Sequence, residues 1–294
     1  ALAHGAHTIT GGLGGLGVRA AALLVARGAS RVLLASRSGR AARGDGRGVE
    51  AALLRAALGG GTAVVRTAAC DGADAADAAA LVGGGPPAGL LHAAGVLHDR
   101  MSRSVAAHEL GLVFGPKACG AAHLHGAAVA TPLWTLGLFS SVSAAFGNVG
   151  QASYAAANAY MDALSLCRRS RGTSGASLQI PAVSGAGMGA ATFDAASLEA
   201  VGAISLDAFA ACLWRCLAGR RAAAECVQVP LSAAIAEAMA AQGSVLSELS
   251  AEAQSSQACA TGIEEHAFLS ISGATSELAR AVARLPPAQR LARA

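Results

Sequence analysis

The stretch TITGGLGGLG, residues 8–17, runs from a short apolar segment through a glycine-rich turn into an Ala-rich segment of helical character. Glycines in such a turn let the chain reverse sharply and bring a pyrophosphate against the backbone N–H groups at the start of a helix. The spacing T-G-x-x-x-G-x-G, with a strand before it and a helix after it, favours nucleotide binding over a purely structural turn. The candidate nucleotide contacts in this turn are Gly11, Gly12, Gly14, Gly15, Leu16 and Gly17.

Short apolar runs alternate with Ala-rich helical stretches over the first 180 residues. This alternation predicts βαβ units and therefore an α/β fold, a doubly wound, Rossmann-like parallel sheet with helices on both faces. Strands are expected at 7–10, 31–36, 62–67, 89–93, 133–141 and 176–180, and helices near 16–27, 49–58, 74–82, 104–129 and 151–171. A last helix around CLWRCLAG (212–219) and a last strand at 226–231 complete the expected elements.

The composition argues against several classes of protein. A net charge of +4 with 14% charged residues is too mild to indicate a nucleic-acid partner, and no apolar run is long enough for a membrane span. Seven scattered cysteines without a C-x-x-C pair indicate a reducing, intracellular compartment, the cytoplasm first and an organelle as the alternative. The HLH run at 123–125 has no supporting ligand cluster, so no metal site is expected.

The ends of the second, third and fourth strands carry further nucleotide candidates. The second strand ends in Ser36 and Arg37, where an NAD-binding protein would place an acidic residue against the ribose 2′-OH. An arginine there favours the 2′-phosphate of NADPH, and a surface arginine in an Arg-rich stretch is the alternative interpretation. Asp71 follows the third strand and is expected near the adenine, and Ala93 and Gly95 follow the fourth, where the backbone passes close to the cofactor.

Residues 139–164, FSSVSAAFGNVGQASYAAANAYMDAL, hold the candidate reaction chemistry. Ser141 ends a strand, Tyr154 lies thirteen residues later in a helix, and Asn158 shares a helix face with Tyr154 at i+4. A serine that holds a carbonyl oxygen and a tyrosine that protonates it make a carbonyl-reduction site. Because the unperturbed pKa of tyrosine is about 10, the tyrosine needs a nearby cation to work near neutral pH.

Lys117, in FGPKACG at 114–120, is the only lysine among 22 Lys and Arg residues. Its ammonium is compact and its pKa can be tuned by the surroundings, which a guanidinium does not allow. A solvated surface side chain is the simple interpretation of a lone lysine. A catalytic cation is the alternative.

These stretches together resemble the ketoreductase domains of modular (type I) polyketide synthases, in the short-chain dehydrogenase/reductase superfamily. The resemblance covers residues 8–190 through TITGGLGGLG, LLASRSG, CDGAD, HAAGVLHD, GPKACGAAHLH and the 139–164 stretch. In that family a lysine stands twenty-four residues before the serine, as Lys117 does before Ser141, and an asparagine follows the tyrosine by four. The resemblance implies a catalytic set of Ser141, Tyr154, Lys117 and Asn158. In this set Lys117 lowers the pKa of Tyr154 and steadies the ribose, and Asn158 holds a water relay.

The resemblance implies NADPH-dependent reduction of a carrier-bound β-ketoacyl thioester to the 3-hydroxyacyl thioester, in polyketide or fatty acid synthesis. The implied partners are an acyl carrier protein with a phosphopantetheine-linked β-ketoacyl chain, and neighbouring synthase domains. A stand-alone 3-oxoacyl carrier-protein reductase and a catalytically silent reductase-like scaffold are the alternatives. The exchanged Lys and Asn places argue against the first, and the complete Ser–Tyr–Lys–Asn set argues against the second.

Two departures from the family pattern concern the substrate. A Leu-Asp-Asp run after HAAG marks family members that give a D-configured 3-hydroxyl, and here the run reads Leu97, His98, Asp99. The Trp that marks the opposite group is replaced by Phe146, so Asp99 is expected to steer the carrier arm and to favour the D product. The family's Asn-Trp-Gly-Pro-Trp-like run over the nicotinamide is altered at residues 179–183.

The expected domain organisation has three parts. Residues 1–231 form the reductase domain, 232–276 a linker that includes AEAQSSQACATG, and 277–294 the start of a truncated carrier-protein-like segment. The chain starts at Ala1 directly before a strand, which indicates a piece of a longer protein. The truncated Rossmann half that precedes such domains is expected to be either absent or cut away.

Overall fold

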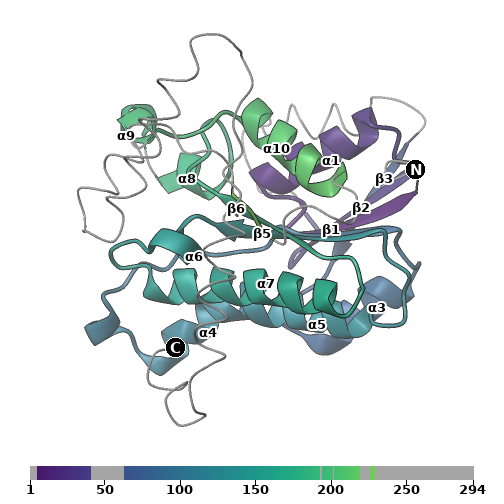
Figure 1. Cartoon of the computed structure of the whole chain (residues 1–294), viewed down its shortest axis with the longest axis horizontal. Helices are drawn as coiled ribbons and strands as arrows, with labels where there is room; N and C mark the ends of the chain where they lie inside the picture. The colour runs from purple at the N-terminus through teal and green to yellow at the C-terminus, as the bar shows by residue number, and fades with distance from the viewer. Residues whose placement is uncertain (1–4, 41–62, 193, 201, 219–225, 229–294) are drawn as a thin grey trace.

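Parallel strands form one sheet through the middle of the molecule (Figure 1). The computed structural model describes residues 5–40, 63–192, 194–200, 202–218 and 226–228. Within these ranges seven strands pair in the order β3-β2-β1-β4-β5-β6-β7, so the chain starts mid-sheet and builds first toward one edge and then toward the other. The strands are β1 Ala6–Thr10, β2 Arg31–Ser36, β3 Val64–Ala69, β4 Gly89–His92, β5 Thr135–Ser141, β6 Ala176–Ile180 and β7 Cys226–Gln228. This is the doubly wound α/β sheet that the sequence predicts.

Helices cover both faces of the sheet, as Figure 1 shows. One layer holds α1 (Gly15–Ala26), α10 (Leu206–Ala218) and the short α8 (Gly187–Thr192) and α9 (Ala195–Ala200). The opposite layer holds α3 (Ala75–Gly83), α4 (Ala107–Phe114), α5 (Gly120–Ala127), α6 (Ser143–Phe146) and α7 (Ala152–Ser170).

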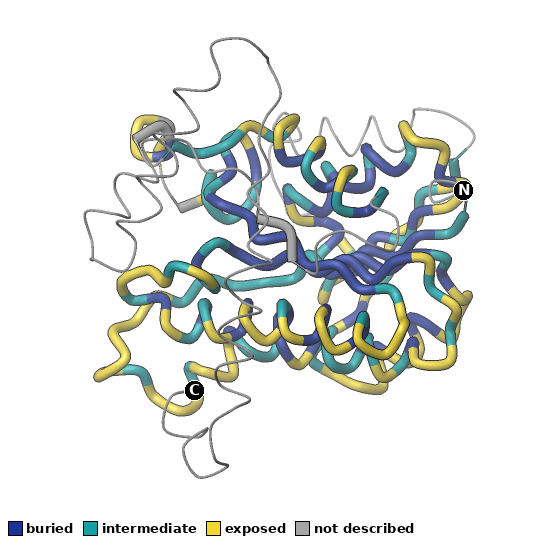
Figure 2. The backbone as a smooth tube through the Cα atoms, viewed as in Figure 1, coloured by how far each residue is buried: buried dark blue, intermediate teal, exposed yellow. Residues whose placement is uncertain are grey.

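The apolar core divides along the sheet into one cluster for each layer. Ile9 and Phe209 belong to the cluster under α1 and α10, and Leu138 and Met161 belong to the cluster under α3, α5 and α7. Strands β4, β5 and β6 are buried along their whole length, and the sheet forms the dark centre of Figure 2. Continuous burial of this kind is typical of a parallel sheet covered on both faces.

The long helix predicted over residues 104–129 is wrong as a single element. The chain forms a 3₁₀ turn at Ser102–Ser104, then α4, then a π-helical turn η2 at Gly115–Cys119, and then α5. Pro116 lies at the start of the π turn and has no backbone N–H to continue an i→i−4 ladder. Single π turns inside helices often occur at functional sites, and this one carries Lys117.

The other differences from the expected elements are small. The third strand starts and ends two residues later than predicted, and the short helices α6, α8 and α9 were not predicted. The helix expected at 49–58, the linker at 232–276 and the carrier-like segment at 277–294 lie outside the described residues. Of the last predicted strand, the described part pairs with β6. No helix in the described ranges has the length and apolar character needed to cross a bilayer.

Candidate active site

The glycine turn after β1 is closely packed against its neighbours. Gly11 has φ +67°, and a Cβ on it would lie 2.5 Å from the Ala94 nitrogen. A Cβ on Gly17 would lie 2.5 Å from the Gly11 carbonyl oxygen. The first turn of α1 holds no acidic residue and its N-cap, Gly14, supplies no side-chain cap, so no side chain competes there for the positive end of the helix. The turn therefore fits a phosphate bound through backbone N–H groups.

The ends of β2 and β3 form the next part of the same edge. Arg37 is exposed at the tip of β2, and the Ser36 hydroxyl is buried without a hydrogen-bond partner among the described residues. Asp71 is exposed after β3, where its carboxylate accepts from the Ala73 N–H. The two strand ends are joined because the Cys70 N–H donates to the Ser36 carbonyl at 2.9 Å. A buried hydroxyl without a partner beside an exposed arginine is a suitable setting for a sugar and its phosphate.

The backbone after β4 closes the nucleotide edge from the other side. The Ala93 N–H donates to the Thr10 carbonyl at 2.8 Å, which holds this segment against the end of β1. A Cβ on Gly11 would also lie 2.6 Å from the Ala93 carbonyl carbon. The structure thus brings together the glycine turn and Ala93, as the sequence interpretation requires.

Lys117 lies inside the protein rather than on its surface. Its side chain is 3% exposed, and its ammonium Nζ donates to the Phe139 carbonyl at 3.0 Å and to Asn158 Oδ1 at 2.9 Å. The same nitrogen lies 5.0 Å from the centroid of the Tyr154 ring, close enough for a cation–π contact. Lys117 and Asn158 are forty-one residues apart in the sequence. Together with Tyr154 they form one buried polar network.

The Asn158 side chain is fully buried within this network. Its Nδ2 donates to the Tyr154 carbonyl at 2.8 Å while its Oδ1 accepts from Lys117. A primary amide has two N–H groups and two lone pairs, so one of each is left over for a further contact. Asn158 therefore fixes the lysine against the tyrosine helix.

The pKa values of the two central groups are shifted by burial. Burial lowers the pKa of Lys117 to about 7, and the negative charge of Asp162 partly raises it. Burial raises the pKa of Tyr154, hydrogen bonding with Asn158 and Ser141 lowers it, and the charge of Asp99 raises it. The phenol is thus held in its protonated form, which is the form that can donate a proton to a substrate oxygen.

Ser141 ends β5 on the same side of the sheet and is 9% exposed. Its hydroxyl oxygen accepts from the Ser143 N–H at 3.2 Å, so the hydroxyl hydrogen stays available to another acceptor. Because Ser141 also acts on the pKa of Tyr154, the two hydroxyls face one region. The structure therefore brings the four predicted catalytic side chains together.

His92 supports the network, and the sequence analysis missed it. The ring is fully buried at the end of β4, with Nε2 2.9 Å from the Lys117 carbonyl and Nδ1 2.7 Å from the Thr10 hydroxyl. Burial lowers the pKa of His92 to about 4, so the ring is neutral. Since a carbonyl only accepts, Nε2 carries the hydrogen and Nδ1 accepts from Thr10. The histidine of HAAG was the available signal.

Gly95 makes room for the lysine. A Cβ on Gly95 would lie 2.8 Å from the Lys117 Cε, so a small residue is needed where the β4 loop crosses the lysine stem. The sequence analysis placed Gly95 beside the cofactor. The structure adds that Gly95 packs on the side chain of Lys117.

Asp162 is the second residue that the sequence analysis missed. It lies one helical turn after Asn158, and its carboxylate accepts from the Ser177 hydroxyl and from Gln179 Nε2, the latter at 2.9 Å. Gln179 and Ile180, where the family pattern has its Asn-Trp pair, are buried in β6. Gln179 therefore holds the carboxylate that acts on Lys117, and the i+4 spacing from Asn158 was the signal.

Asp99 is exposed and lies in the loop that precedes α4. Its carboxylate accepts from Gln151 Nε2 at 3.1 Å, and Gln151 is the residue before α7. The neighbouring Arg100 N–H donates to the Gly150 carbonyl at 2.8 Å. The loop is thereby attached to the start of the tyrosine helix.

A doubly wound parallel sheet with a glycine turn after β1 and a tyrosine helix after β5 is the short-chain dehydrogenase/reductase form of the Rossmann-like fold. A solved levodione reductase, 19% identical with a TM-score of 0.63, shares this fold over 76% of the chain and 95% of its own length. The family model of KR domains matches residues 5–185, and the chain belongs to this family, the ketoreductase domains of polyketide synthases. The family is one of oxidoreductases that use a nicotinamide cofactor.

Relatives of known sequence and structure support this assignment. The spectinabilin polyketide synthase system protein NorA′ of Streptomyces orinoci is 43% identical over 181 residues, which is 60% of this chain and 5% of that protein. The 5-methyl-1-naphthoate synthase of Streptomyces sahachiroi is 40% identical over 67% of this chain and 12% of its own length.

Two solved ketoreductases are similar in structure. The first ketoreductase of the tylosin PKS is 37% identical with a TM-score of 0.68, over 81% of this chain and 51% of its own. An A1-type ketoreductase is 33% identical with a TM-score of 0.71, over 81% of this chain and 50% of its own. The chain spans about half the length of these solved chains and a small part of the curated synthases.

Proposed function

We propose that the chain uses NADPH to reduce the β-keto group of an acyl thioester held on a carrier protein, and that the product is the 3-hydroxyacyl thioester. The observation that carries this proposal is the buried ammonium of Lys117, bound to Asn158 and placed over the ring of Tyr154. A buried lysine is costly, and this one is held beside a protonated phenol, which is the arrangement that carbonyl reduction needs.

The chain's own groups fit a phosphorylated dinucleotide. The N–H groups of Gly15, Leu16 and Gly17, at the start of α1, would hold the pyrophosphate, and Ser36 and Arg37 would hold the 2′-phosphate. Asp71 and Ala93 would line the adenosine side. When bound, NADPH supplies the hydride that the β-keto carbon accepts.

The protein's part is to bind the keto oxygen and to move one proton. Ser141 and Tyr154 donate hydrogen bonds to the oxygen, and Tyr154 gives it a proton as negative charge develops there. The ammonium of Lys117, which lies over the Tyr154 ring, stabilises the phenolate that remains. Asn158 and His92 keep the lysine in place through its ammonium and its carbonyl.

A catalytically silent scaffold is the second candidate, since residues 179–183 differ from the family's pattern. Gln179 argues against a silent scaffold, because it binds the carboxylate of Asp162, whose negative charge acts on Lys117. A scaffold without activity has no need for a buried lysine whose pKa is about 7.

The test is the oxidation of NADPH, followed optically, with a β-ketoacyl thioester on a carrier protein, with the free thioester and with a bulky model ketone. We expect turnover with all three and the highest kcat/KM with the carrier-bound chain. Turnover of the free thioester alone, with no gain from the carrier, would favour a stand-alone reductase. No oxidation of NADPH with any of the three contradicts the proposal.

The proposed partners are the acyl carrier protein and neighbouring synthase domains, as the multidomain relatives suggest. We propose further that Asp99 steers the carrier arm to give mainly the D-configured 3-hydroxyl. Its carboxylate is attached to Gln151 at the start of the tyrosine helix, and its charge acts on Tyr154. Chiral chromatography of the product tests this, and a mainly L product contradicts it.

A further inference from the structure

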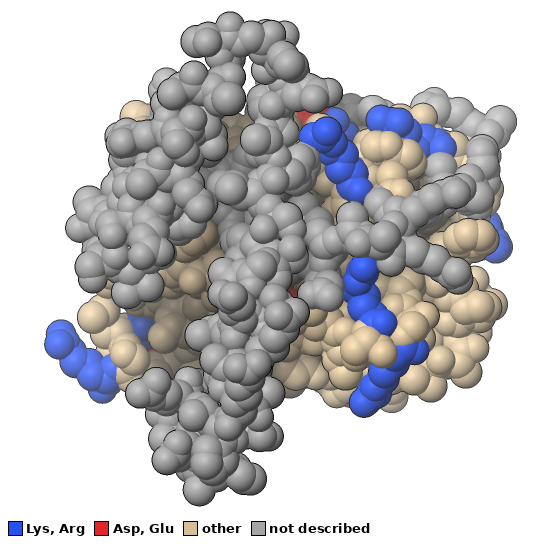
Figure 3. All heavy atoms as spheres, in the orientation of Figure 1, with Lys and Arg blue, Asp and Glu red and all other residues tan. Residues whose placement is uncertain are grey.

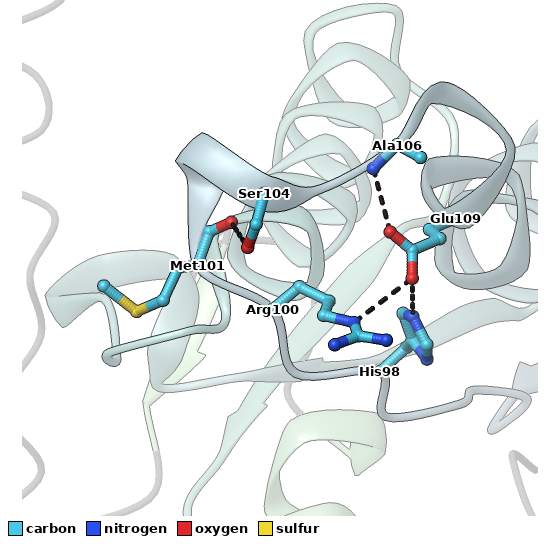
Figure 4. Close-up of polar contacts among 6 residues, drawn as sticks. All are labelled: His98, Arg100, Met101, Ser104, Ala106 and Glu109. Carbon is cyan, nitrogen blue, oxygen red and sulfur yellow. Dashed lines mark hydrogen bonds and ion pairs between the residues drawn. The ribbon is translucent and has the colours of Figure 1, made fainter.

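The loop between β4 and α4 makes contacts both with the residues at the start of α7 and with the first turn of α4. Asp99 binds Gln151 on the side of the tyrosine helix, and Arg100 binds the Gly150 carbonyl through its backbone. The side chains on either side of Asp99, those of His98 and Arg100, bind Glu109 in the first turn of α4 (Figure 4).

Both of these side chains bind one carboxylate. Glu109 Oε1 accepts from His98 Nε2 at 2.8 Å and from Arg100 Nε at 3.2 Å, and its other oxygen accepts from the Ala106 N–H at 2.8 Å (Figure 4). The Glu109 side chain is 12% exposed, so three donors meet a largely covered acceptor. The pKa of Glu109 is lowered to about 2 by hydrogen bonds from the Ala106 N–H and His98 and by the charge of Arg100. The carboxylate therefore stays ionised.

These contacts limit where Asp99 can lie, because both of its neighbours in the chain bind one carboxylate. Glu109 holds the loop against the start of α4, and Gln151 holds it against the start of α7. Arg100 and Arg103 are exposed, and Figure 3 shows basic side chains at the lower left of the drawn face.

We propose that Glu109 is a positioning residue that sets the face of the acyl chain presented for reduction, by holding the loop that carries Asp99. The proposal rests on the proposed function and deepens it, since it names the residue that controls the configuration of the product. It also explains why His98 stands where a Leu-Asp-Asp run has its first aspartate. A carboxylate at position 98 would face the carboxylate of Glu109, whereas His98 donates to it, so His98 and Glu109 form a matched pair.

The main test compares wild type with Glu109→Gln, using the carrier-bound β-ketoacyl thioester. An amide places an NH2 group where one carboxylate oxygen accepted, so at least one of the three donors loses its partner. We expect the ratio of D to L product to fall by about five- to tenfold and the KM for the carrier-bound chain to rise. The kcat for a small model ketone should change less than about twofold, because the Lys117 network is not touched. His98→Ala should shift the ratio in the same direction by a smaller factor.

The capping of α4 needs its own control, because Glu109 also binds the Ala106 N–H. Ala106→Ser with Glu109→Gln restores a side-chain cap at the helix start and leaves the loop unheld. If the double variant recovers the wild-type ratio, Glu109 acts only through the helix cap and the inference is wrong. Asp207→Asn removes another carboxylate–arginine pair, that of Asp207 with Arg19, and should leave the ratio unchanged.

A second measurement does not depend on activity. Hydrogen exchange of the segment 97–106 should be faster in Glu109→Gln than in wild type, with the exchange of α5 and β5 unchanged. Unchanged exchange together with an unchanged product ratio overturns the inference while wild-type turnover stands. Failure of the wild type to oxidise NADPH overturns the proposed function, and the exchange data then still decide whether Glu109 holds the loop.

Discussion

The glycine turn at residues 11–17 and the polar network around Lys117 lie along the same carboxyl edge of the sheet, and they are joined through Thr10 and His92. In the turn, the close packing requires that side chains be absent, because a Cβ at Gly11 or Gly17 would meet backbone at 2.5 Å. In the network, the arrangement depends on a charged side chain, because the Lys117 ammonium donates hydrogen bonds to the Phe139 carbonyl and to the Asn158 amide oxygen. The glycine turn presents backbone groups, and the network presents a charged side chain.

This difference determines how each part responds to substitution. The turn should be sensitive to the size of a side chain and insensitive to charge nearby, because backbone N–H groups have no pKa to tune. The network should be sensitive to charge and to pH, because burial has already moved the pKa of Lys117 to about 7. Each prediction below changes one of these properties while the other is kept.

The largest effect is expected from Lys117→Arg, which keeps the charge and changes the shape. The lysine stem passes close to Gly95, where an added Cβ would already lie 2.8 Å from Cε, so a planar guanidinium does not fit the same place. Turnover should fall by about 10²- to 10⁴-fold, nearly as far as in Lys117→Ala. Steady-state oxidation of NADPH measures this, with circular dichroism to show that the variants are folded. If the turnover of the arginine variant is within a few-fold of that of the wild type, Lys117 does not have the proposed role in the reaction.

The second effect is expected from Gly17→Ala, with Gly14→Ala as the matched control in the same turn. The new Cβ at 17 would meet the Gly11 oxygen at 2.5 Å, whereas at 14 it would meet that oxygen at an ordinary 3.4 Å. Overpacking costs about 1–3 kcal/mol, and because the displaced backbone lines the phosphate site, nucleotide affinity should fall about ten- to a hundredfold. Titration of NADPH by fluorescence and thermal unfolding measure the two losses. Equal behaviour of the two variants would show that backbone packing does not set this part of the site.

The same contrast explains how much could be predicted from the sequence. The fold and the glycine turn depend on local patterns, so the alternation of apolar runs and the spacing of Gly11, Gly15 and Gly17 were sufficient. Lys117 was found through its distance from Ser141 in a resembled family. Its π turn was not, because that turn results from Pro116 and from packing against the β4 loop rather than from periodicity.

The supporting residues were harder to predict for a physical reason. His92 acts on Lys117 through its backbone carbonyl, and Asp162 acts on it through space. The histidine of HAAG and the i+4 spacing from Asn158 were visible in the sequence, but neither showed that the residue acts on Lys117. Glu109 was missed because its partners, His98 and Arg100, lie in a loop whose direction only the structure fixes. Local elements could be derived from sequence, and contacts between distant elements could not.

Arg37→Ala tests the positively charged side chain that we place against the 2′-phosphate at the nucleotide end. A charge-assisted contact with the 2′-phosphate contributes about 1.5–3 kcal/mol, so the KM for NADPH should rise about ten- to a hundredfold. The KM for NADH should stay almost unchanged, because NADH carries no phosphate at that position. Parallel kinetics with both cofactors measure the split. An equal loss for NADPH and NADH would show that Arg37 acts on the structure of the turn and not on the phosphate.

The smallest effect, and the most specific to charge, is expected from Asp162→Asn. The groups that face Lys117 are the phenol of Tyr154, the neutral ring of His92 and the carboxylate of Asp162, and only Asp162 raises the pKa of the lysine. Reduction needs the protonated ammonium, so activity is lost as pH rises through the pKa of Lys117, which is about 7. Removing the negative charge lowers that pKa, and the alkaline limb of kcat/KM should therefore move to lower pH, while rates at acid pH approach those of wild type. A pH profile with a model ketone from about pH 5.5 to 9 measures the shift. Asp207→Asn, a surface carboxylate paired with Arg19, is the matched control and should leave the limb in place. If the alkaline limb does not move in Asp162→Asn, the pKa of Lys117 is set by burial alone. Charge would then matter as little in the network as we expect it to in the glycine turn.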